Sequence, residues 1–234
     1  MPTPLALRVV EAYGAEARWR AAEAVECRLS AHGWAFRLRL RRAMKRVAIR
    51  AMIAKPHLVM QDWPGRGLRG VLDGPSEVRI ETNAGELVSR REEPRKYFPG
   101  GRRSFRWDDL DSLYFAGYAA WNYLTFTALL LREDIAWTEV SETTLEATFP
   151  ATIPTHSPVQ RFHIDPATAL LRQHDYTAEV FGGWAHAANI VETHGTWEGI
   201  PYPSRRKVTP RKRDGTPRPF PLLVGIEVRD WRLV

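Results

Sequence analysis

The sequence has very little cysteine. Cys27 is the only one among 234 residues, and it cannot form a disulfide within its own chain, so a disulfide-rich scaffold is excluded. Glycine and proline are numerous but do not recur at a fixed period, which excludes a collagen-like chain. The first thirteen residues lack a basic segment followed by a continuous apolar one. The sequence therefore predicts no secretory signal and a cytoplasmic protein.

Motifs of cofactor and metal chemistry are also absent. The chain contains no glycine-rich phosphate loop, no nucleophile elbow and no zinc-protease helix, so we expect no cofactor. Five histidines lie in the second half of the chain, but their predicted strand positions distribute them over both faces of a sheet. Metal ligands must converge, so we expect no metal site. The five are His156, His163, His174, His186 and His194.

Apolar and aromatic side chains, in contrast, are abundant. Hydrophobic residues make up 44% of the chain and charged residues 26%, with nine Trp, nine Phe and seven Tyr. This composition buries enough apolar surface to offset the entropy lost on folding, which excludes a mostly disordered chain. The length fits one domain with a sizeable core, so we predict a single domain over residues 1–234.

Positive charge is concentrated in two segments. The net charge is +7, with seven basic residues and no acid over 37–50, and seven basic residues and one acid over 205–218. Such clusters can neutralise phosphates or attract an acidic partner or an anionic membrane. The arginines from 37 to 41 alternate with apolar residues, so we interpret them as the solvated face of a strand over 34–41 and expect no nucleic-acid partner.

The spacing of apolar residues predicts the order of elements. Residues 5–22 show helical spacing, and the period then changes to two in short runs over 25–91, separated by Gly, Pro, Asn and Asp. A loop and a helix follow over 92–132, and further short strands over 136–234. The connections between strands are too short for crossover helices, so the strands form an antiparallel meander.

The stretch 112–131 carries no charge. Twenty such residues can span a bilayer, but Tyr, Asn and Thr side chains in its middle make it only moderately apolar, and we expect no transmembrane span. A helix that is apolar all round must be covered all round. We therefore predict an α+β fold, mainly antiparallel, in which a strongly curved half-barrel of about eleven strands wraps this helix. The N-terminal helix or a ligand closes the open side.

A hairpin is predicted near the C-terminus. Gly182 and Gly183 separate two alternating runs, as in a two-residue turn. In this register Glu179 pairs with His186, and Asp175 lies on the solvated face. The opposite, inner face carries small residues and three polar ones, which suit either a hydrogen-bonded core or a cavity beside the helix. These three are His174, Tyr176 and Asn189.

Several motifs resemble those of a bacterial family that is uncharacterised. They are Trp107–Asp111, Tyr114–Leu124, Leu170–Tyr176 and Gly199–Pro201, with the first two reading WDDLD…YFxGYAxWNYL. More distantly, the order of elements resembles the lipoprotein-carrier superfamily of the bacterial envelope, the LolA, LolB and RseB-like proteins. That resemblance implies a half-barrel meander with inserted helices on its concave side, where members hold acyl chains. Those proteins are exported and this sequence predicts no signal, so the resemblance implies the architecture rather than lipoprotein transport.

The function predicted from these features is binding of an apolar small molecule or acyl chain in the concave face. The predicted ligand contacts are Tyr114, Tyr118, Trp121, Asn122, Thr125, His174, Tyr176 and Asn189. The alternative is an enzyme of the cyclase or isomerase type, which folds an apolar substrate in the same cavity with His174 or Tyr176 as acid or base. An interaction module that uses the basic segments is a third interpretation.

Overall fold

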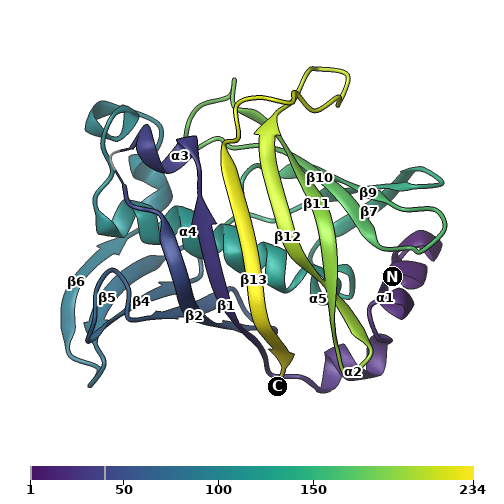
Figure 1. The fold of residues 1–234 in the computed structure, drawn as a ribbon, viewed down its shortest axis with the longest axis horizontal. Helices are drawn as coiled ribbons and strands as arrows, with labels where there is room; N and C mark the ends of the chain where they lie inside the picture. The colour runs from purple at the N-terminus through teal and green to yellow at the C-terminus, as the bar shows by residue number, and fades with distance from the viewer. Residues whose placement is uncertain (1, 40) are drawn as a thin grey trace.

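The computed structural model describes residues 2–39 and 41–234 (Figure 1). The helices are α1 (Pro4–Ala12), α2 (Glu16–Ala21), α3 (Trp34–Arg37), α4 (Asp109–Leu124) and α5 (Phe126–Leu130), with 3₁₀ turns η1 (Pro94–Tyr97) and η2 (Gly101–Ser104). The strands are β1 (Ala24–His32), β2 (Met44–Met52), β3 (His57–Gln61), β4 (Leu68–Asp73), β5 (Glu77–Thr82), β6 (Leu87–Glu92), β7 (Ala136–Ser141), β8 (Thr144–Thr148), β9 (Val159–Ile164), β10 (Leu171–Thr177), β11 (His186–Trp197), β12 (Ile200–Pro210) and β13 (Val224–Leu233).

All of these strands form one antiparallel sheet. The first six run outward from β1 to β6, the last seven run inward from β7 to β13, and β1 pairs with β13 in the middle of the sheet. The chain passes from one edge strand to the other through α4 and α5, and Figure 1 shows α4 crossing behind the central strands, inside the curve of the sheet. The predicted α+β half-barrel around a buried helix is confirmed, with thirteen strands rather than about eleven.

Helix α4 begins at a capping box. The side chain of Asp108 accepts a hydrogen bond from the backbone N–H of Asp111, and the Asp111 side chain accepts one from the backbone N–H of Asp108. This pair satisfies two of the N–H groups that a helix start leaves free. The predicted uncharged helix is in fact two helices, because the chain leaves helical geometry at Thr125, whose hydroxyl donates to the Trp121 carbonyl.

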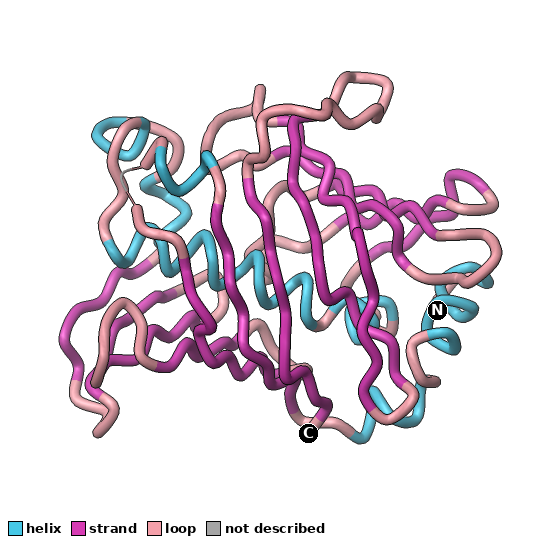
Figure 2. The backbone as a smooth tube through the Cα atoms, in the orientation of Figure 1, coloured by secondary structure: helices cyan, strands magenta, loops and turns pink. Residues whose placement is uncertain are grey.

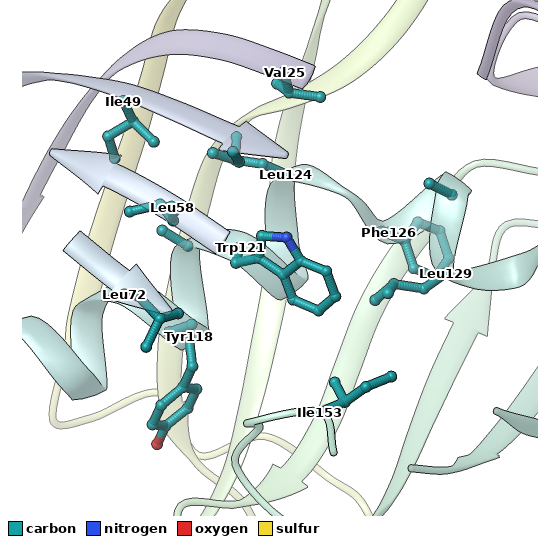
Figure 3. Close-up of a cluster of buried hydrophobic side chains, with 14 of the residues drawn as sticks. Val25, Ile49, Leu58, Leu72, Tyr118, Trp121, Leu124, Phe126, Leu129 and Ile153 are labelled. Carbon is teal, nitrogen blue, oxygen red and sulfur yellow. The ribbon is translucent and has the colours of Figure 1, made fainter. Parts of the chain in front are cut away.

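The concave side of β2 to β5 packs directly on α4. Figure 3 shows Trp121 beside Leu58 and Leu72 from these strands and near Leu124 from the helix itself. The Trp121 side chain is fully buried, and its indole N–H donates to the Met52 carbonyl at 2.7 Å. This side of α4 therefore belongs to the core.

The predicted N-terminal helix over 5–22 is broken into α1 and α2, which Figure 2 shows as two helical segments joined by a bend. The break falls at Gly14 and Ala15, which both adopt positive φ, at +97° and +70°. Left-handed backbone of this kind ends an α-helix. Helix α1 packs against α5 and so helps to cover the end of the half-barrel near β7.

The predicted strand over 34–41 is wrong. Gly33 ends β1 with φ +130°, and a Cβ there would meet the Leu223 carbonyl oxygen at 2.5 Å. The chain then forms α3, where the backbone N–H groups of Trp34 and Ala35 donate to the carbonyls of Leu222 and Leu223. Leu40 lies outside the described residues. The arginines of this segment consequently lie at one end of the half-barrel and not on a strand face.

The predicted two-residue turn at Gly182 and Gly183 is also wrong. Thr177 pairs with His186, and residues 178–185 form a wider loop between β10 and β11. The true register differs from the predicted one by two residues. A shift of two leaves every side chain on its predicted face. His174 and Asn189 are therefore paired neighbours on the inner face.

The outer face of this hairpin departs further from the prediction. Asp175 is buried rather than solvated, because the segment 211–215 covers it, and its carboxylate lies 3.1 Å from His163 Nε2 and 3.7 Å from Arg211 Nε. The predicted Glu179–His186 pair does not form. Glu179 instead pairs with Arg95 at 2.6 Å.

Across the described ranges, none of the helices has the length and the apolar character that crossing a membrane would require.

Candidate functional site

A cleft of about 400 Å³ opens at the end of the half-barrel that carries α3. We call it the mouth cleft. Its walls come from α3, the start of β2, the loop after β3 and the N-terminal half of α4. The apolar lining residues include Phe36, Met44, Trp63, Trp107, Phe115 and Ala116. Arg41, Arg42 and Lys45 add positive charge to it.

Two smaller spaces continue inward from the mouth cleft, and we call them together the inner slot. The first, of about 50 Å³, shares Phe36, Met44, Phe115 and Ala116 with the cleft. The second, of about 20 Å³, shares Leu29, Tyr123 and Ile226 with the first. Since each space shares lining residues with the next, the mouth cleft and the two spaces of the inner slot are adjacent in that order.

Two rows of side chains wall the inner slot. On α4 the row consists of Ala116, Ala119, Ala120 and Tyr123, at helical spacing. On the sheet the row crosses four strands through successive pairs, and its members are Met44, Ala31, Ile226 and Arg206. Small side chains on the helix leave room between it and the central strands, whereas the opposite side of α4 packs tightly on β2 to β5.

The predicted ligand contacts divide into three groups. Tyr176 lines the inner slot. Tyr114, Tyr118, Trp121, Asn122 and Thr125 are buried in the core on the other sides of α4 and at its end. Asn189 on β11 and His174 on β10 are buried beside the slot, one and two strands further along the sheet than β12.

The structure also brings in residues that the sequence reasoning did not select. Phe115, Ala119 and Tyr123 all face the cleft or slot. A sequence signal for the first two exists, since they lie four residues apart on one helical stripe. Arg206, from the second basic segment, lines the second space of the inner slot. Arg206 and Val208 are two residues apart on β12, and this alternation is the sequence signal that predicts the inner face of the sheet for both.

A buried cluster of one histidine and three tyrosines lies at the inner end. The Tyr123 hydroxyl lies 2.7 Å from His156 Nε2 and 2.8 Å from the Tyr176 hydroxyl, and the Tyr118 hydroxyl lies 3.3 Å from His156 Nδ1. The rings of His156 and Tyr176 stack at 3.8 Å. Burial, with a smaller contribution from the charge of Arg95, holds the pKa of His156 well below its ordinary value. The cluster is therefore uncharged at neutral pH.

His174 is held in a similar way. Its Nε2 lies 2.6 Å from the side-chain oxygen of Gln160, whose amide nitrogen donates to the Thr155 hydroxyl and the Ser157 carbonyl. The ring stacks on Phe162 at 4.1 Å. Burial lowers the pKa of His174 well below its ordinary value. The His174 ring is therefore neutral and held in place by stacking and hydrogen bonding.

Comparison with known proteins gives a fold and no sequence family. No protein-family model matches the chain, and no curated protein sequence matches it. A LolA superfamily protein from Nitrosomonas europaea is similar in structure, with a TM-score of 0.54 and 8% sequence identity over 100% of this chain and 94% of that one. The fold is LolA-like. A DUF1329 family protein from Desulfovibrio piger aligns with a TM-score of 0.46 and 13% identity, over 98% of this chain and 90% of that one.

The LolA-like fold confirms the architectural resemblance seen in the order of elements. In this LolA-like sheet the mouth cleft and the inner slot occupy the space between the inserted helix α4 and the concave face. Among the side chains described, no three of His, Cys, Asp or Glu gather in a way that would hold a metal ion.

The buried histidines of the LolA-like core predict a loss of stability in mild acid. In the folded protein both His156 and His174 stay neutral below pH 6.5, whereas in the unfolded chain they bind protons near that pH. Protonation therefore favours the unfolded chain as the pH falls through about 6.5, and each histidine adds up to about 1.4 kcal/mol per pH unit. Urea denaturation at pH 7 and pH 5 measures this slope. His156→Gln is expected to have a shallower slope, and an unchanged slope would contradict the assignment.

Proposed function

We propose that this protein binds an apolar small molecule or acyl chain in the mouth cleft and the inner slot. The observation that carries the proposal is a cleft of about 400 Å³, walled by aromatic and aliphatic side chains, that continues between α4 and the concave face of the sheet. Small-molecule sites are commonly apolar concavities of about 300–1,000 Å³ with a few convergent polar groups. The mouth cleft has this size and lining.

The proposed contacts follow the walls of the cavity. Phe36, Phe115 and Ala116 contact the ligand near the entrance, and Tyr123 and Tyr176 contact it at the inner end. The remaining predicted contacts support these walls from behind. They are Tyr114, Tyr118, Trp121, Asn122, Thr125 and His174, whereas Asn189 is buried beside the inner slot, next to β12. A fold does not determine a ligand, so this assignment rests on the cavity of the chain itself.

Binding is favoured over the cyclase or isomerase alternative by the state of the two acid–base candidates. His174 Nε2 is engaged by Gln160, and the Tyr176 hydroxyl is engaged by Tyr123. Burial lowers the pKa of His174 and raises that of Tyr176, each well away from its ordinary value. A general acid or base works best with a pKa near the working pH, and these two groups are moved away from it.

Retention of an apolar ligand is the direct test. Native mass spectrometry of freshly purified protein, followed by organic extraction, is expected to show an apolar compound that leaves with the solvent. Ala116→Trp places a large ring where the mouth cleft meets the inner slot and is expected to reduce the bound fraction at least about tenfold, because the cavity can no longer hold a ligand.

The matched control is Ala84→Trp, which adds the same ring in an exposed turn and is expected to retain the ligand as the unmodified protein does. The proposal fails if the freshly purified protein carries nothing apolar and also binds no added fatty acid. It fails equally if Ala116→Trp folds and retains as much ligand as the control.

A further inference from the structure

Arg206 is a buried arginine without a carboxylate partner. It lies on β12, and its side chain points into the half-barrel at the deepest space of the inner slot. Its Nη1 atom is buried and has no hydrogen-bond partner, and no acidic group of the described chain forms an ion pair with it. Its neighbours are rings, since the guanidinium lies 5.1 Å from the centre of the Tyr123 ring.

Other buried charges in the molecule are paired. Asp111 binds Arg91 at 2.7 Å and Arg103 at 2.5 Å. Glu81 binds Arg69 and Arg79 at 2.6 and 2.5 Å. Arg206 differs from these because the chain places a full positive charge inside the sheet and supplies no anion for it.

Burying a charge without a partner is costly, and the contact with an aromatic ring offsets only part of this cost. Burial accordingly lowers the pKa of Arg206, although an arginine remains protonated at neutral pH. A site that keeps such a charge is suited to receive an anion from outside the chain.

A second unpartnered polar group lies beside the arginine. Asn189 is fully buried on β11, and neither its side-chain oxygen nor its nitrogen has a hydrogen-bond partner. Val191 is the cross-strand partner of Arg206. Asn189 lies two residues before Val191 and so shares the inner face with Arg206 as a diagonal neighbour. The amide N–H₂ of Asn189 and the guanidinium of Arg206 are both donors.

Arg206 lies far along the cavity from the mouth cleft. Arg206 is the last member of the sheet row that begins at Met44 in the mouth cleft. On α4, the facing wall runs from Ala116 to Leu124, a rise of roughly 12 Å. Arg206 therefore lies at the end of this apolar path that is away from the mouth cleft.

We propose that Arg206 and Asn189 bind the carboxylate of a fatty-acid-like ligand, whose chain lies along the inner slot with its tail toward the mouth cleft. This assignment rests on the proposed function and names its ligand class. The fork of the guanidinium matches the two oxygens of a carboxylate, and the Asn189 amide donates a further hydrogen bond. The space at Arg206 is about 20 Å³ and the space between it and the mouth cleft is about 50 Å³, so the chain enters by displacing side chains such as Tyr123.

The test compares an acid with its uncharged ester. The probes are cis-parinaric acid and its methyl ester, whose fluorescence rises on transfer to an apolar site. The unmodified protein is expected to bind the acid at least about tenfold more tightly, as a charge-assisted hydrogen bond provides. Arg206→Met is expected to lose this preference while binding the ester as before, and Arg206→Lys, which keeps the charge but not the fork, is expected to keep part of it.

The matched control is Arg205→Met, which removes the same charge from the adjacent, exposed position of β12 and is expected to keep the preference for the acid. Equal affinities for acid and ester in the unmodified protein would overturn the head-group assignment alone. A preference that survives in Arg206→Met would overturn it too. If the unmodified protein binds neither probe, the head-group assignment is wrong, and if the freshly purified protein also carries nothing apolar, the proposed function is wrong as well.

Discussion

Asp111→Ala is expected to lower the free energy of unfolding by about 3–5 kcal/mol, since removing one partner of a buried ionic group leaves the other unpaired. Asp111 is fully buried at the first turn of α4. Its carboxylate receives hydrogen bonds from Arg91 and Arg103 and from the backbone N–H of Asp108. The substitution leaves two largely buried guanidinium groups without this anion and also breaks the capping box of the helix.

Urea denaturation followed by circular dichroism measures the effect. Glu16→Ala provides a contrast, because Glu16 forms an exposed i, i+4 bridge with Arg20, and such pairs contribute about 0.5 kcal/mol or less. A loss of less than about 1 kcal/mol in Asp111→Ala would show that the arginines find other partners or water. The expected loss would instead show that this ionic cluster fixes the start of α4, and with it the wall of the mouth cleft.

The meander could be predicted from the sequence because its signals are local. Strands β3, β5 and β9 lie within the predicted strand regions 25–91 and 136–234, since alternation and turn residues lie within each segment. The prediction of a strand over 34–41 was wrong because a long-range contact determines the structure of this segment. Its alternation resembles that of a strand, but α3 forms where Trp34 and Ala35 meet the carbonyls of residues 222 and 223, which lie almost two hundred residues away.

The candidate site was harder to predict than the fold. A helix that is apolar all round has no polar stripe to mark which side faces the solvent or a cavity, so its pattern did not distinguish the side of Ala116 and Ala119 from the side of Tyr118 and Trp121 as the cavity wall. The space is determined by close packing of α4 on β2 to β5. That packing fills one side of the helix and leaves the inner slot on the other.

Arg206 could not be identified as a site residue from the sequence, because it lies among other basic residues. Arg206 lies in a segment with six other basic residues, and such runs are usually solvated. On β12, however, Arg205 is exposed and Arg206 and Val208 are buried. The alternation of a strand thus separates one arginine of this run from its neighbours and directs it to the interior.

The two sides of α4 consequently have separable roles, one in stability and one in the proposed binding. Trp121→Ala tests the first role and is expected to lower the free energy of unfolding by about 3–5 kcal/mol, as large-to-small changes of a buried Trp do. The side chain is fully buried among Leu58, Leu72 and Leu124 (Figure 3), and its loss also removes the donor to the Met52 carbonyl.

The second role is measured on the same variant. Trp184→Ala is the control for stability, because Trp184 is 76% exposed in the 178–185 loop, and a change there is expected to stay within about 0.5 kcal/mol. At a temperature where Trp121→Ala is folded, its affinity for cis-parinaric acid is expected to stay within about twofold, since the Trp121 side chain lines neither the mouth cleft nor the inner slot. A large loss of affinity in folded Trp121→Ala would contradict this separation and would place the ligand on the Trp121 side of the helix. Retained affinity together with the loss of stability would place it along the Ala116 side.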